Sequence, residues 1–261
     1  MIPNPIQKVL STLSTHQVRY LLMGGQACVF YGAAEFSRDC DIAILCEPQN
    51  LARLQAALDE LQARTIAVPP FDADYLLRGH AVHFRCHAPE VENMRLDVMA
   101  RMRGVADFDE LWSRRTTLEE GSSRALELMS LQDLVAAKKT QRDKDWPMIR
   151  RLVEANYAQH QKAPSDEQTL FWLLESRTPE ILVEIAAHNA EAAQAATERR
   201  PLLVEAIAAD RKALRQALTI EQEAERDADR SYWELLKREL EQLRHDRKEN
   251  SIGASTPDLL K

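Results

Sequence analysis

Glycine is rare in this chain of 261 residues, and its distribution limits the folds that the chain can adopt. Only seven glycines occur; three fall between Gly24 and Gly32, and none lies between Gly121 and Gly253. Because glycine is costly inside helices, the long stretch without it favours a second half built of helix. The concentration near residue 24 indicates a place where the backbone needs conformational freedom or a close approach.

The composition excludes several classes of protein. Hydrophobic residues make up 45% of the chain and charged residues 29%, as in ordinary globular proteins. The net charge is −7, and both halves hold more acidic than basic residues, which is unlike a duplex DNA binder. No apolar run approaches the roughly 20 residues of a membrane span, and the N-terminus lacks a signal-peptide pattern. We therefore expect a cytoplasmic protein without a membrane partner.

The cysteines support the same expectation. They form no CxxC pair, so they indicate neither a zinc ribbon nor a disulfide framework. We expect four buried, inert thiols, at Cys28, Cys40, Cys46 and Cys86.

The N-terminal half is predicted to be a small mixed α/β unit, because short apolar strands alternate with helical patterns. Asn50 is the expected cap of its second helix. The expected order is a strand at 17–23, a helix at 26–33, a strand at 41–46, a helix at 50–63, and strands at 81–87 and 94–99.

The C-terminal half is predicted to be helical. Helices are expected at 131–154 and 167–175, and 179–248 is nearly all helix-forming. One apolar stripe there is predicted to pack on its own chain, or alternatively to bind a partner helix. Its members are Ile220, Ala224, Ala228, Leu235, Leu236, Leu240 and Leu243. We expect domains at 1–155 and 160–248, and a disordered tail at 249–261.

Three aspartates are the strongest candidates for chemistry. Asp39 and Asp41 flank Cys40 at the start of a strand, so alternation predicts that both carboxylates point to one side. Asp97 lies within the apolar strand 94–99, where a carboxylate needs a partner. Carboxylates that lie close together repel unless a cation lies between them, and oxygen ligands suit Mg²⁺. Alone, the pair at 39 and 41 is equally well an ordinary strand-end turn.

Two further features suit a phosphate. Gly24 and Gly25 precede a predicted helix, where backbone N–H groups are exposed at the positive end of the dipole, although an isolated pair also suits a tight turn. Lys138, Arg142 and Asp145 fall at i, i+4 and i+7 of a predicted helix and would share one face. Two cations there could meet a triphosphate, or the face could simply be solvated.

These elements together resemble the signature of the polymerase-beta-like nucleotidyltransferase superfamily: Gly24-Gly25, thirteen residues, Asp39-Cys-Asp41, then Asp97 on a later strand. The stretch 131–145 is similar to the helical motif of small bacterial nucleotidyltransferases, including abortive-infection type toxins. The resemblance covers roughly residues 5–155. It implies an α+β fold, with a small mixed β-sheet nucleotidyltransferase core and flanking helices, followed by an all-helical C-terminal region.

The resemblance also implies an activity: transfer of a nucleoside monophosphate from an NTP to a hydroxyl of RNA, protein or a small molecule. Asp39, Asp41 and Asp97 would be the catalytic residues and hold two Mg²⁺ ions. Nucleotide contacts, ATP binding among them, would come from Gly24, Gly25, Ser37, Lys138 and Arg142, with Lys139 as the alternative to Lys138. A toxin–antitoxin or phage-defence role, with an antitoxin or other protein partner, is suggested by the resemblance alone.

A second hypothesis is a catalytically weakened nucleotidyltransferase-like interaction protein that binds a partner through helices 160–248. Relatives often carry an arginine where this chain has Glu35 and Phe36, with Arg38 close by. A metal site at 83–87 is disfavoured, because strand alternation separates Cys86 from His83 and His87.

Overall fold

A computed structural model describes residues 4–34, 36–120 and 124–253 of the chain. The fold is mixed α+β, with 59% of residues in helix and one seven-stranded sheet, which confirms the expected class. By their contacts, the residues group into two compact units. The first contains Met1–Gly24, Arg38–Leu128 and Ser231–Lys261, and the second contains Gly25–Ser37 and Met129–Arg230.

The sheet belongs to the first unit, and its strand order is β3-β4-β5-β2-β1-β7-β6. The strands β2 and β5, and also β1 and β7, run parallel, and the other neighbours are antiparallel. The strands are β1 (Tyr20–Met23), β2 (Cys40–Ile44), β3 (Arg64–Thr65), β4 (Val82–Arg85), β5 (Arg95–Met99), β6 (Thr116–Glu120) and β7 (Arg124–Leu128).

The central strands β1 and β2 are mostly apolar, as expected where both faces of a sheet are covered. All four residues of β1 are buried, and in β2 every residue except Asp41 is buried. The edge pair of β6 and β7 was missed by the sequence analysis, because its polar and charged residues lack a clear apolar signal.

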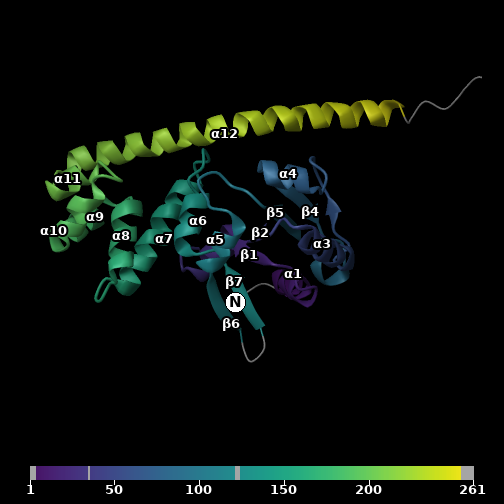
Figure 1. Cartoon of the computed structure of the whole chain (residues 1–261), viewed down its shortest axis with the longest axis horizontal. Helices are drawn as coiled ribbons and strands as arrows, with labels where there is room; N and C mark the ends of the chain where they lie inside the picture. The colour runs from purple at the N-terminus through teal and green to yellow at the C-terminus, as the bar shows by residue number, and fades with distance from the viewer. Residues whose placement is uncertain (1–3, 35, 121–123, 254–261) are drawn as a thin grey trace, which may run out of the picture. The chain divides into compact units, whose positions relative to one another are not determined.

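The first unit also contains α1 (Asn4–Thr15), α3 (Pro48–Glu60), α4 (Ala73–Arg78), α5 (Phe108–Ser113) and the short 3₁₀ turn Pro89–Val91. Helix α1 packs against that turn and against α3 (Figure 1). Helix α2 (Gly24–Phe30) falls almost wholly in the second unit. Helices α1, α4 and α5 were not predicted from the sequence.

The predicted cap Asn50 is wrong. Helix α3 has Pro48 in its first turn, so Asn50 lies inside the helix. Its buried amide instead donates to the carbonyls of Arg19 and Leu45 and accepts from the Arg19 N–H. Asn50 thus ties α3 to the ends of β1 and β2, where backbone groups would otherwise lack partners.

The remaining helices are α6 (Leu131–Ala137), α7 (Asp145–His160), α8 (Asp166–Glu175), α9 (Pro179–His188), α10 (Ala190–Ala196), α11 (Leu203–Ile207) and α12 (Arg211–Gly253).

Two predictions about this part of the chain need correction. The expected helix 131–154 is interrupted by a turn between α6 and α7. The expected disordered tail begins too early, because residues 249–253 belong to α12, while 254–261 lie outside the described residues. The predicted domain boundary at 155–160 falls at the end of α7, inside the second unit.

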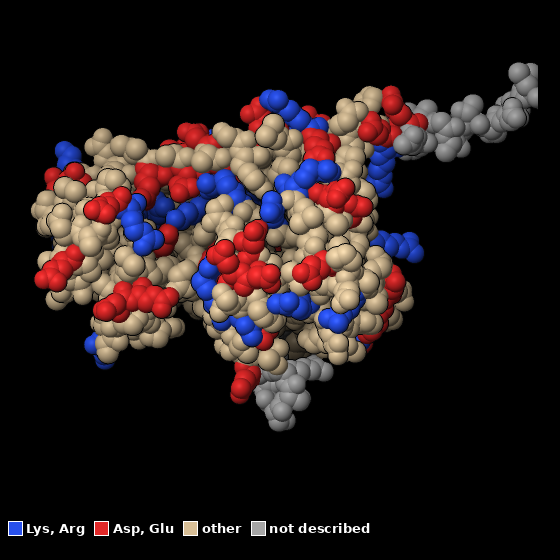
Figure 2. Space-filling view, viewed as in Figure 1, with Lys and Arg blue, Asp and Glu red and all other residues tan. Residues whose placement is uncertain are grey.

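Helix α12 is one continuous helix of 43 residues in which both signs of charge occur (Figures 1 and 2). Its predicted apolar stripe divides between two faces. Leu236 is buried and Leu240 is half-buried, whereas Ile220 and Leu235 are 63% and 71% exposed. Neighbours on a helix are about 100° apart, so Leu235 and Leu236 cannot share one face. Within the described residues, no helix has the length and apolarity needed to span a membrane.

Candidate functional site

A row of polar side chains crosses three neighbouring strands of the first unit. Asp41 on β2 lies opposite Asp97 on β5, and Asp97 lies opposite His83 on β4. All three are half-buried, while the residues that flank Asp97 on β5 are buried. Residues opposite each other on adjacent strands lie roughly 5 Å apart and point to the same face. The fold therefore brings Asp41, Asp97 and His83 together.

Asp97 is held by two donors. The Nδ1 atom of His83 lies 2.9 Å from Oδ1 of Asp97, and Nε of Arg95 donates to the same oxygen at 2.8 Å. The Asp97 side chain is only 13% exposed. Burial by itself would raise the pKa of Asp97, but the hydrogen bonds and charges of His83 and Arg95 outweigh it, so the pKa lies below its usual value. The Asp97 contact in turn raises the pKa of Arg95.

His83 and Arg95 were not predicted as partners of Asp97. Arg95 was detectable, because it precedes Asp97 by two residues on one strand and must share its face. His83 was not, because its position opposite Asp97 depends on the pairing of β4 with β5. That register comes from the tertiary structure.

Gly24 and Gly25 have no side chain of their own, and each leaves space for a different neighbouring side chain. Gly24 has a positive φ of 65°, and a Cβ atom there would overlap the carboxylate of Asp41. Within the second unit, a Cβ atom on Gly25 would lie 2.6 Å from Oγ of Ser37. The need for two glycines therefore has a direct steric cause, and their contact with phosphate stays a prediction.

Asp39 stands apart from this strand geometry. β2 begins at Cys40, so Asp39 lies in the bend before the strand, is exposed, and strand alternation does not fix its direction. Cys40 is fully buried, and burial raises its pKa well above the usual value, as expected of an inert thiol. Cys28 and Cys86 are also buried, whereas Cys46 is only half-buried. Phe36 is 61% exposed, and Glu35 lies outside the described residues.

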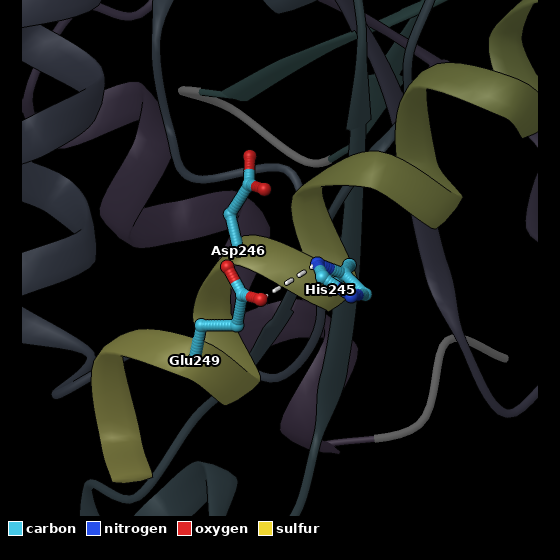
Figure 3. Close-up of side chains that lie close together, drawn as sticks. All are labelled: His245, Asp246 and Glu249. Atoms are coloured by element: carbon cyan, nitrogen blue, oxygen red, sulfur yellow. Dashed lines mark ion pairs between the residues drawn. The ribbon is translucent and has the colours of Figure 1, made fainter. Parts of the chain in front are cut away.

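The described part of the chain holds one group of three His, Cys, Asp or Glu side chains whose ligand atoms all lie within 4.8 Å of one another. This group lies away from the row of Asp41, Asp97 and His83. It consists of His245, Asp246 and Glu249, all exposed near the end of α12 (Figure 3). Their spacing along a charged helix accounts for the grouping. The three predicted metal ligands, Asp39, Asp41 and Asp97, do not form such a group.

The basic motif lies in the second unit and is not on one helix, contrary to the prediction. α6 ends at Ala137, and Asp145 begins α7, so residues 138–144 form the turn between them. The turn nevertheless gathers the predicted side chains. Nε of Arg142 donates to Oδ2 of buried Asp145 at 2.7 Å, and Nζ of Lys138 lies 3.8 Å from Oδ1.

Two further hydrogen bonds fix the shape of this turn. Thr140 donates through Oγ1 to Asp145, and Trp146 donates through its ring nitrogen to the Thr140 carbonyl. Lys139 instead pairs with Glu175 at 2.8 Å. The structure therefore distinguishes the two lysines: Lys138 shares Asp145 with Arg142, and Lys139 contacts α8.

No protein-family model matches the chain, and a search of curated proteins finds no match to it. A functional assignment therefore has to rest on the side chains themselves.

Proposed function

We propose that the protein is a Mg²⁺-dependent nucleotidyltransferase that transfers a nucleoside monophosphate from an NTP to a hydroxyl acceptor. The observation that carries this proposal is the pairing of Asp41 with Asp97 on two parallel strands, with Gly24 making room for the Asp41 carboxylate. Two half-buried carboxylates that lie opposite each other on one face repel, and a divalent cation between them would offset that repulsion. The proposal places this unit in the polymerase-beta-like superfamily that its motifs resemble.

The residues fit a hard divalent cation. Both donors to Asp97 engage Oδ1, so Oδ2 keeps its acceptor capacity for a metal ion. Asp41 and Asp39 would supply the remaining carboxylate oxygens. Bound Mg²⁺ would neutralise charge on the phosphates during nucleotidyl transfer.

In this proposal the protein's own residues have separate roles. Asp39 and Asp41 would hold the two metal ions, and Asp97 would help to hold one and, through Oδ2, would accept the proton of the attacking hydroxyl. Within the second unit, Lys138 and Arg142 would meet the charge of a triphosphate, and Gly25 and Ser37 are further proposed nucleotide contacts. Gly24 is the proposed nucleotide contact of the first unit. Such a reaction needs positioning and charge neutralisation more than covalent help from the protein.

The acceptor would be RNA, a protein hydroxyl or a small molecule. A place in a toxin–antitoxin or phage-defence pair, with an antitoxin as partner, rests on the resemblance of the motifs alone.

A second candidate function is that of an interaction protein with weakened catalysis. The observation that favours it is the exposed apolar part of α12, where Ile220 and Leu235 face solvent together with Ala224 and Ala228. Exposed apolar residues at helical spacing suit a groove on a partner.

Calorimetric titration with ATP, GTP, CTP and UTP, each with and without Mg²⁺, separates the two candidates. The enzyme requires Mg²⁺-dependent binding of at least one NTP, and this binding should weaken in Lys138→Met. Lys144→Met, which removes an exposed lysine from the same turn, is the matched control. Absence of NTP binding in the presence of Mg²⁺ would refute the nucleotidyltransferase proposal and favour the interaction protein.

A further inference from the structure

We propose that His83 and Arg95 are positioning residues that hold the Asp97 carboxylate in the orientation in which it binds a divalent cation. This inference rests on the proposed function, because it concerns the same carboxylate. Neither side chain belongs to the aspartate motif, and each acts on the metal only through Asp97.

The two donors approach one oxygen from different strands. His83 is the register partner of Asp97 on β4, and Arg95 lies two residues before Asp97 on β5. Contacts of 2.9 and 2.8 Å to the same Oδ1 restrict rotation of the carboxylate and leave Oδ2 for the cation. Groups that orient a metal ligand in this way commonly change metal affinity about 10- to 100-fold when removed.

The hydrogen bonds also define the state of His83. A carboxylate can only accept hydrogen bonds, so the proton of the His83–Asp97 contact lies on Nδ1. Nη2 of Arg95 lies 3.2 Å from that same Nδ1 but cannot donate to a nitrogen that already carries a proton, so the hydrogen bond of Arg95 in this set is the one from Nε to Oδ1 of Asp97. An asparagine at position 83 can place an amide N–H close to the position of Nδ1, whereas leucine cannot donate.

The positive charge of Arg95 allows a test that distinguishes a positioning role from a merely electrostatic one. A cation near a Mg²⁺ site repels the metal, so removing a merely neighbouring arginine should tighten metal binding. Removing a positioning arginine should weaken it. The two roles of Arg95 thus predict effects of opposite sign.

Arg85 is the matched control for charge. It lies opposite Arg95 in the pairing of β4 with β5 and shares the face of His83, because the two are separated by two positions on β4. It is exposed, and its side chain makes no hydrogen bond or ion pair with the residues that the structure describes. Arg85→Met therefore removes the same charge without disturbing Asp97.

The test is titration of the full chain with Mn²⁺, followed by electron paramagnetic resonance, with circular dichroism to confirm folding. We expect His83→Leu and Arg95→Met to weaken Mn²⁺ binding about 10-fold or more, and His83→Asn to restore most of it. Arg85→Met should leave binding unchanged or slightly tighter. Unchanged or tighter binding in both His83→Leu and Arg95→Met would overturn the inference, as would a loss in His83→Asn equal to that in His83→Leu.

Asp97→Asn distinguishes this inference from the function on which it rests. If Asp97→Asn abolishes Mn²⁺ binding while His83→Leu and Arg95→Met do not affect it, positioning is refuted and the metal site stands. If Asp97→Asn has no effect on Mn²⁺ binding, both the metal role of Asp97 and the positioning role of its neighbours are refuted.

Discussion

At the scale of single residues, Asp97 is the side chain on which most of the site depends. Burial disfavours its charge, and the contacts with His83 and Arg95 favour it more strongly. A buried carboxylate with two donors from separate strands also links β4 to β5. Asp97 therefore contributes to folding as well as to the proposed chemistry, and the first contribution can be measured through pH.

The pKa of Asp97 in the folded protein lies below the value of about 3.9 expected in the unfolded chain. The stabilisation from its charge is therefore fully present above the unfolded pKa and is lost as pH falls through the folded pKa. Urea unfolding in the presence of a chelator should show Asp97→Asn less stable than the unaltered protein at pH 7. That difference should shrink below about pH 4.

Asp109→Asn removes an exposed carboxylate and controls for the loss of one negative charge. A stability difference for Asp97→Asn that persists undiminished to pH 3 would contradict the account of Asp97.

Gly24 offers a second test at the same scale. Gly24→Ala places a Cβ atom against the Asp41 carboxylate and also strains a backbone with positive φ. Gly104→Ala is the matched control, because Gly104 has a φ of 69° but no described atom within 4 Å of an added Cβ. We expect Gly24→Ala to lower the free energy of unfolding by about 1–3 kcal/mol more than Gly104→Ala, from overpacking. Equal losses in chemical denaturation would show that Asp41 does not pack on Gly24.

At the scale of helices and strands, the sequence predicted those elements in which apolar residues recur at regular spacing. The buried strands β1, β2, β4 and β5 and the helices α3 and α8 lie near their expected ranges, because their apolar spacing is regular. The turn 138–144 was missed. Its residues are good helix formers, and hydrogen bonds to the Asp145 side chain override that preference.

Helix α12 is anchored to the second unit by a buried ion pair. Arg200 donates to Glu221 through Nε at 3.0 Å and Nη2 at 2.8 Å, and its Nη1 donates to the Leu173 carbonyl. Burial would raise the pKa of Glu221, but Arg200, together with the charges of Arg177 and Lys139, outweighs burial, so the pKa lies below its usual value. Removing Arg200 would leave this carboxylate, in a poorly hydrated place, with Arg177 at 2.9 Å as its remaining close partner.

Arg200→Met should therefore lower the free energy of unfolding by about 1–3 kcal/mol, because the hydrogen bonds of Arg200 are lost while Arg177 still compensates the charge of Glu221. Arg215→Met is the control, because the pair of Arg215 with Glu180 is exposed and its loss should be too small to measure. Urea denaturation followed by circular dichroism distinguishes the two. A loss in Arg200→Met no larger than that in Arg215→Met would show that the buried pair does not anchor the helix.

At the scale of the whole molecule, the two compact units are each built from separated segments. The first unit takes residues 231–261 from the far end of the chain, and the second takes residues 25–37 from the near end. A change in composition along the sequence marks where helices begin, not which segments pack together. For the same reason the sequence could propose Asp39, Asp41 and Asp97 as a set, while only the strand register brings His83 to Asp97.

The central claim is nucleotidyl transfer that depends on the aspartates. The most direct measurement incubates the protein with each α-labelled NTP, Mg²⁺, and total cellular RNA and protein, and then follows the label. We expect label to move to one class of acceptor, to stop when the metal is chelated, and to fall at least about 100-fold in the Asp39→Ala/Asp41→Ala double variant. Full transfer by the double variant, or no transfer of any NTP by the unaltered protein, would contradict the claim.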